Sequence, residues 1–171
     1  MRRKRTTARR PSPEVSLLLS ILDEGYSRKA WQGPNLRGSL RGVTAREAAW
    51  RPRSGRHNIW ELVLHAAYWK YAVRRMLSGE KRGSFPEKGS NWFARSAGSE
   101  KKWRADLALL EESHGRLREV VAALPVSALS RRPPGSKYRT ATMIYGVAAH
   151  DVYHTGQIQL LKSLGRKARG G

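Results

Sequence analysis

Cysteine is absent from the 171 residues of the chain. This absence excludes a disulfide framework, a zinc finger, an iron-sulfur cluster and a cysteine nucleophile. Any metal ion that the chain binds must therefore be held by histidine, aspartate or glutamate. Any thiolate chemistry must use a thiol that is supplied from outside.

Acidic residues are scarce, since 13 aspartates and glutamates stand against 34 lysines and arginines, for a formal net charge of +21. Such a charge attracts polyanions, acidic lipids and anionic small molecules, and it says little about the fold. The basic residues are dense at both ends of the chain. We expect a disordered basic tail at residues 1–11, a single domain at residues 12–165 and a second basic tail at residues 166–171.

Long apolar runs are also missing, and none approaches the roughly 18 residues of a membrane-spanning helix. The basic start and the apolar run at residues 15–22 loosely imitate a secretory signal. Asp23 and Glu24 follow directly, however, where a cleavage site needs small residues. The run is better interpreted as the buried side of a helix, and the sequence predicts a cytoplasmic protein without a membrane segment.

No alternating strand pattern occurs, whereas four segments carry apolar residues at helical spacing. An all-α fold, a four-helix bundle, is therefore expected. The connections are longer than helical hairpins require, so the sequence is compatible both with a simple up-down-up-down order of the helices and with crossover connections. One connection contains a capping box at residues 44–47, and another, residues 80–98, is expected to pack through its aromatic residues. The expected helices run from Pro13 to Trp31, from Ile59 to Gly79, from Ser99 or Glu100 to Pro125, and from Thr140 or Thr142 to Leu164.

Three histidines lie on apolar helical faces. His150 and His154 are four residues apart, so both point from one face of the last helix. His65 occupies the apolar face of the second helix. If these helices pack together, the three imidazoles converge, and they either bind a divalent metal or are core histidines hydrogen-bonded to neighbours.

Three segments together resemble a known family: Trp50-Arg51-Pro52, NIWELVLHAAYW at residues 58–69, and HDVYHTGQI at residues 150–158. On these segments, residues 12–165 resemble the DinB/YfiT-like superfamily of metal-binding four-helix bundles. The resemblance implies a metal site made by His65, His150 and His154, with water or substrate at the remaining positions. It does not distinguish among Zn, Ni, Fe and Mn as the metal, and it is compatible with a homodimer.

The resemblance also implies a class of chemistry. Characterised members include thiol-dependent S-transferases that use bacillithiol and a mycothiol-dependent maleylpyruvate isomerase. We therefore expect a metal-dependent enzyme that transfers or activates a low-molecular-weight thiol and takes a small-molecule substrate, with hydrolysis as a variant. Cationic side chains near the site would hold carboxylates, and the candidates are Arg51, Arg53, Arg56, Arg74 and Arg139.

Other residues near these segments have a functional and a structural interpretation. His114 is either a fourth ligand or a core histidine, and His57 is interpreted as a loop residue. Glu61 and Asp151 either orient a ligand imidazole or serve as a helix cap or an exposed carboxylate. Tyr153 and Gln157 can either line a cavity or pack in the core. Three tryptophans are expected to pack: Trp60, Trp69 and Trp92.

Two other functions compete with an enzyme. A metal-binding scaffold without catalysis would use the same histidines. A basic nucleic-acid-binding protein would explain the charge, but no recognition-helix arrangement or aromatic RNA-binding motif is present. Basic tails alone give weak, salt-dependent binding to any phosphate backbone, so no specific nucleic acid partner is expected.

Overall fold

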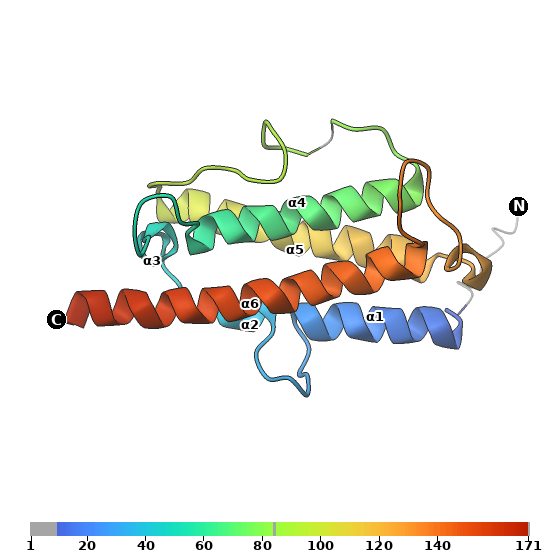
Figure 1. The fold of residues 1–171 in the computed structure, drawn as a ribbon, viewed down its shortest axis with the longest axis horizontal. Helices are drawn as coiled ribbons and strands as arrows, with labels where there is room; N and C mark the ends of the chain where they lie inside the picture. Colours follow the sequence, from blue (N-terminus) through green and yellow to red (C-terminus); the bar gives the residue numbers. More distant parts are fainter. Residues whose placement is uncertain (1–9, 84, 171) are drawn as a thin grey trace, which may run out of the picture.

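The structure of the chain, a computed structural model, describes residues 10–83 and 85–170. Four long helices lie side by side, and two short helices and a 3₁₀ turn stand in the connections (Figure 1). The described residues form no strand, so the predicted all-α bundle is confirmed. Most of the predicted N-terminal tail lies outside the described residues. The elements are α1 Pro13–Tyr26, α2 Leu36–Ser39, α3 Ala45–Ala49, α4 Ile59–Ser78, α5 Glu100–Ala122, η1 Val126–Ala128 and α6 Thr140–Gly170.

Side-chain caps fix the helix starts that the sequence predicted. Ser12, Asn58 and Ser99 each accept a hydrogen bond from a backbone N–H three residues further on, which satisfies a donor that the helix leaves free. The capping box of α3 forms between Thr44 and Glu47. Gly79 ends α4 in the left-handed conformation, at φ 73°, that glycine adopts without steric cost.

Three predicted helix ends are wrong. α5 ends at Ala122 rather than Pro125, since a proline disfavours helical backbone at the residue before it. The first helix ends at Tyr26 rather than Trp31, because the following residues offer no apolar side chain to the bundle, and Trp31 is fully exposed. The last helix continues to Gly170 instead of ending at Leu164, so residues 166–170 extend α6. Gly165 does not end this helix: a Cβ atom there would lie 3.2 Å from the Trp50 ring, so the glycine allows close packing.

The order of the helices explains the long connections. α1 packs against α5 and α6, and α4 packs against the same two helices. α1 and α6 run in one direction, and α4 and α5 run in the other (Figure 1). Because α4 and α5 are parallel neighbours, residues 79–99 must return along the length of the bundle. This return segment brings aromatic residues to α4, and Phe93 is buried there.

The core has an apolar cluster at each end of the bundle and a buried ion pair between them. Lys70 of α4 and Asp151 of α6 are fully buried and paired with each other. Paired charges at such depth are tolerated only when they stay together, so this pair ties α4 to α6 next to His150. None of the described helices combines the length and the apolar character that a bilayer span requires.

Candidate metal centre

His65, His150 and His154 meet where α4 packs against α6. The Nε2 atom of His150 lies 3.0 Å from Nε2 of His65 and 3.0 Å from Nε2 of His154. One nitrogen of each ring lies within 4.8 Å of the others, which is the spacing of ligand atoms around a single ion. His65 and His154 are buried and His150 is half-buried. The predicted convergence of the three imidazoles is confirmed.

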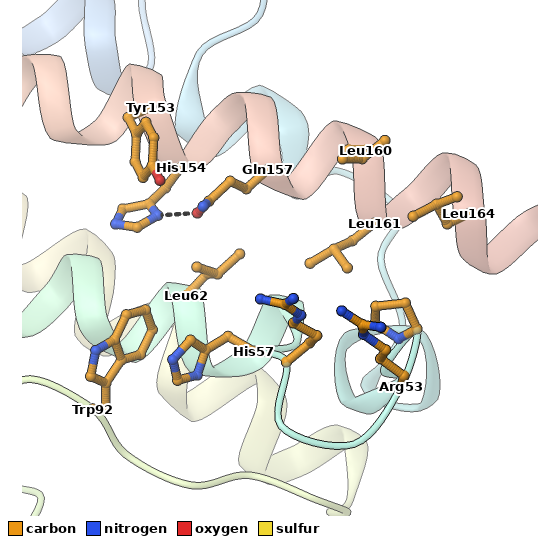
Figure 2. Close-up of a pocket in the computed structure, with 12 residues that line it drawn as sticks. Arg53, His57, Leu62, Trp92, Tyr153, His154, Gln157, Leu160, Leu161 and Leu164 are labelled. Carbon is orange, nitrogen blue, oxygen red and sulfur yellow. Dashed lines mark hydrogen bonds between the residues drawn. The ribbon is translucent and has the colours of Figure 1, made fainter.

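Hydrogen bonds at the outer ring nitrogens orient two of the imidazoles. Nδ1 of His65 donates to the backbone oxygen of Asn91, at 2.7 Å. Nδ1 of His154 donates to Oε1 of Gln157, at 2.6 Å, as Figure 2 shows. Both Nε2 atoms therefore present lone pairs, which is the tautomer that a metal ligand needs.

The inner nitrogens do not satisfy one another. Nε2 of His150 carries at most one hydrogen, and it faces two lone pairs, those of His65 and His154. At most one of the two close contacts can therefore be a hydrogen bond, and the other brings two electronegative nitrogens together with no hydrogen between them. The Nδ1 atom of His150 is also buried without a hydrogen-bond partner among the described residues. A cation between the three Nε2 atoms removes this repulsion, so the donor set fits a divalent metal.

The surroundings keep the three rings neutral. Burial, together with the neighbouring imidazoles, lowers the pKa of His65 to about 4 and the pKa of His150 to about 3, although the bond to Asn91 opposes the change at His65. Burial also lowers the pKa of His154, although the bond to Gln157 opposes the change. Neutral imidazole is the form that binds metal, so the site is ready for an ion at neutral pH.

The return segment covers one side of the site with Trp92. Its indole stacks on His65, with ring centroids 3.8 Å apart and planes 8° apart. Asn91, which precedes it, adopts a left-handed backbone at φ 66° and accepts a hydrogen bond from Trp69 through its side chain. One loop thus supplies both the hydrogen-bond partner and the stacking partner of His65.

Two cavities open on different sides of the three histidines. The first has a volume of about 530 Å³ and includes His154 in its wall (Figure 2). The second has a volume of about 710 Å³ and includes His65 and His150. The first is lined by Pro52, Arg53, Arg56, His57, Leu62, Trp92, Tyr153, His154, Gln157, Leu160, Leu161 and Leu164.

A family model of the DinB superfamily matches residues 30–158, a range that contains all three histidines. The chain belongs to the DinB superfamily. A search among curated proteins and a search among solved structures each found no match. In this DinB-superfamily chain, the family match and the three-histidine cluster agree with the resemblance that the sequence motifs carry.

The structure separates the remaining candidate residues of this DinB-superfamily protein. His114 lies outside the cluster, where it stacks on Tyr26 at a centroid distance of 4.0 Å and faces Asp23. It is a core histidine. Tyr153 and Gln157 line the first cavity, as one interpretation of the sequence had it. Trp60 packs in the core as predicted, whereas Trp92 lines the first cavity and Trp69 lines the second, which sequence reasoning missed.

Neither interpretation of the two carboxylates is correct. Asp151 is neither exposed nor bonded to a ligand imidazole, because it pairs with Lys70. Glu61 is buried in the first turn of α4 and binds Arg51 and His57 rather than His65. Asn91, whose backbone oxygen orients His65, had no signal in the sequence, since the bond depends on where the return segment crosses α4.

The structure also selects among the candidate arginines. Arg51 is bound to Glu61 and Arg74 is bound to Glu80. Arg139 does not line either cavity. Arg53 and Arg56 line the first cavity, and neither guanidinium has a partner among the described residues. Among the five candidate arginines, these two are the ones that line a cavity beside the candidate metal centre without a partner in the described part of the chain.

Proposed function

We propose that this DinB-superfamily protein is a cytoplasmic, metal-dependent enzyme that activates a low-molecular-weight thiol and transfers it to a small electrophile. One observation carries the proposal. Three neutral imidazoles converge through Nε2 on a point that adjoins two cavities, and the described residues place no fourth ligand there. A three-histidine set leaves coordination positions for a substrate.

His65, His150 and His154 would hold the ion. When bound, a divalent metal supplies Lewis acidity, which lowers the pKa of a thiol so that its anion forms near neutral pH. The chain contributes the rest. Asn91 and Gln157 fix the tautomers of two imidazoles, and Trp92 shields His65 from water.

The first cavity suits an anionic thiol. Arg53 and Arg56 line it, and their guanidinium groups have no partner within residues 10–83 and 85–170. A guanidinium binds a carboxylate or sulfonate through two parallel hydrogen bonds. The opposite wall is apolar and includes Leu160 and Leu161 of α6. A small molecule with an acidic group at one end therefore matches this cavity.

The second cavity suits the electrophile. Its wall combines His65 and His150 with apolar and aromatic side chains, among them Trp69, Met143 and Tyr145. Lys137 is the one lysine or arginine among the described residues of this wall. Two substrates could thus approach the three histidines from different sides, as a transfer reaction requires.

The test is turnover by metal-loaded protein. The chain is loaded in turn with Zn, Ni, Mn or Fe, and conjugation of cysteine or 2-mercaptoethanesulfonate to 1-chloro-2,4-dinitrobenzene is measured, with ester hydrolysis as a second assay. We expect conjugation that His154→Ala abolishes. Hydrolysis that depends on His154 would replace the transferase proposal, and stoichiometric metal without either activity would favour a scaffold.

A further inference from the structure

His57 lies in the same cavity as His154, on the loop that precedes α4. Its Nδ1 atom lies 3.0 Å from Oε2 of Glu61, one helical turn further on. The carboxylate can only accept, so Nδ1 carries the hydrogen and Nε2 presents a lone pair. Nε2 has no hydrogen-bond partner among the described residues.

Glu61 is itself held in place. Arg51 binds both of its carboxylate oxygens, and the backbone N–H of Arg95 donates to Oε1 at 3.1 Å. Although burial opposes ionisation, these bonds and the one from His57 lower the pKa of Glu61 to about 2. A fixed carboxylate that bonds to Nδ1 orients an imidazole and stabilises its cation, as in other carboxylate–histidine pairs.

Trp92 fixes the plane of the His57 ring. The two rings stack with centroids 3.6 Å apart and planes 4° apart, and the opposite face of Trp92 stacks on His65. The indole is therefore enclosed between the imidazole of the acid–base pair and an imidazole of the candidate metal centre. His57 is exposed, but it is held by one hydrogen bond and one stacking contact, so it differs from an ordinary loop histidine.

We infer that His57, oriented by Glu61, is the proton acceptor for the thiol that enters the cavity beside His154. The inference rests on the proposed function and adds a catalytic residue to it. The S–H bond of the thiol breaks and its proton moves to Nε2 of His57. The sulfur electron pair forms the bond to the electrophilic carbon, the leaving group departs with its own electron pair, and His57 returns the proton to it or to water.

The titratable and charged groups around His57 belong to four elements. Glu61 and His65 lie on α4, His154 lies on α6, and Arg95 lies on the return segment. The fourth is the loop itself, whose arginines are Arg51, Arg53 and Arg56. Arg51 is neutralised by Glu61, and an anionic thiol would neutralise the two that lack partners. The carboxylate of Glu61 is thus the charge in direct contact with the imidazole.

The experiment measures the number of protons released when the thiol binds. Binding of 2-mercaptoethanesulfonate to the zinc-loaded full chain is measured by calorimetry in buffers of different ionisation enthalpy, between pH 6 and 8, where free thiols are largely protonated. His57→Asn keeps an N–H near the position of Nδ1 and removes the acceptor at Nε2. His57→Phe keeps only the stacking contact. Zinc content and circular dichroism verify that each variant is folded and loaded.

We expect the wild type to retain the thiol proton and both variants to release about one more proton per thiol bound. In the conjugation assay, kcat should fall about 100-fold with little change in KM, and added imidazole should restore part of it. Equal proton release by wild type and variants would overturn the role of His57 and leave the proposed function intact. A wild type that binds zinc and no thiol would overturn both.

Discussion

The Nε2 atoms of His150 and His154 lie 3.0 Å apart across one turn of α6. Two imidazoles at this spacing, with a third from α4, present more lone pairs than hydrogens to one another. The arrangement costs free energy in the absence of a cation and is relieved by one, which leads to the first prediction.

The chain should bind one divalent ion, and His65→Ala, His150→Ala and His154→Ala should each lower the affinity at least 100-fold, because each removes one of three ligands. Elemental analysis and zinc titration measure this. His114→Ala is the matched control, since His114 is equally buried but lies outside the cluster. Stoichiometric, tight zinc in His150→Ala would show that the ligand set is wrong.

Gln157→Leu should weaken zinc binding about 10- to 100-fold, because Nδ1 of His154 loses its acceptor and the ring loses its orientation. Gln157→Glu keeps an oxygen acceptor at the same position and should preserve binding. Competition with a chelator of known affinity measures both variants. Equal affinities for Gln157→Leu and the wild type would show that the hydrogen bond does not support the site.

Lys70→Met should destabilise the protein by about 3–5 kcal/mol, because Asp151 is left as an unpaired charge in the core. Removing both charges, in Lys70→Met with Asp151→Leu, should recover most of that loss. Urea unfolding of the three proteins provides the comparison. A double variant that is no more stable than Lys70→Met would contradict the account of the ion pair.

The stability of the metal-free protein should decrease as the pH falls from 7 to 5. Burial lowers the pKa of His65 and His114 to about 4 and of His150 to about 3, against 6.5 in the unfolded chain. The unfolded state therefore binds more protons in this range, so the free energy of unfolding falls by up to about 2 kcal/mol per histidine.

Urea unfolding at several pH values tests this dependence above the range in which carboxylates titrate. His114→Phe should make the slope shallower by the share of one histidine and leave zinc binding unchanged. A slope that is the same in wild type and His114→Phe would mean that His114 is not held neutral in the folded state.

Local sequence determined the helices and most of their boundaries. Ser12, Asn58 and Ser99 cap helices because their side chains satisfy nearby backbone donors, whatever the rest of the chain does. The spacing of His150 and His154 placed both on one face for the same local reason. The largest exceptions lie at Trp31 and Leu164. The residues after Tyr26 do not pack against the bundle, so the helix ends early, whereas Gly165 packs against Trp50 and the last helix continues.

Tertiary structure alone decided what surrounds the histidines. The parallel arrangement of α4 and α5 sends residues 79–99 back across α4, which brings Asn91 and Trp92 to His65. No spacing in the sequence encodes that meeting, because the partners are more than 25 residues apart and belong to different elements. The same holds for Lys70 and Asp151, which form a buried pair only because α4 packs against α6.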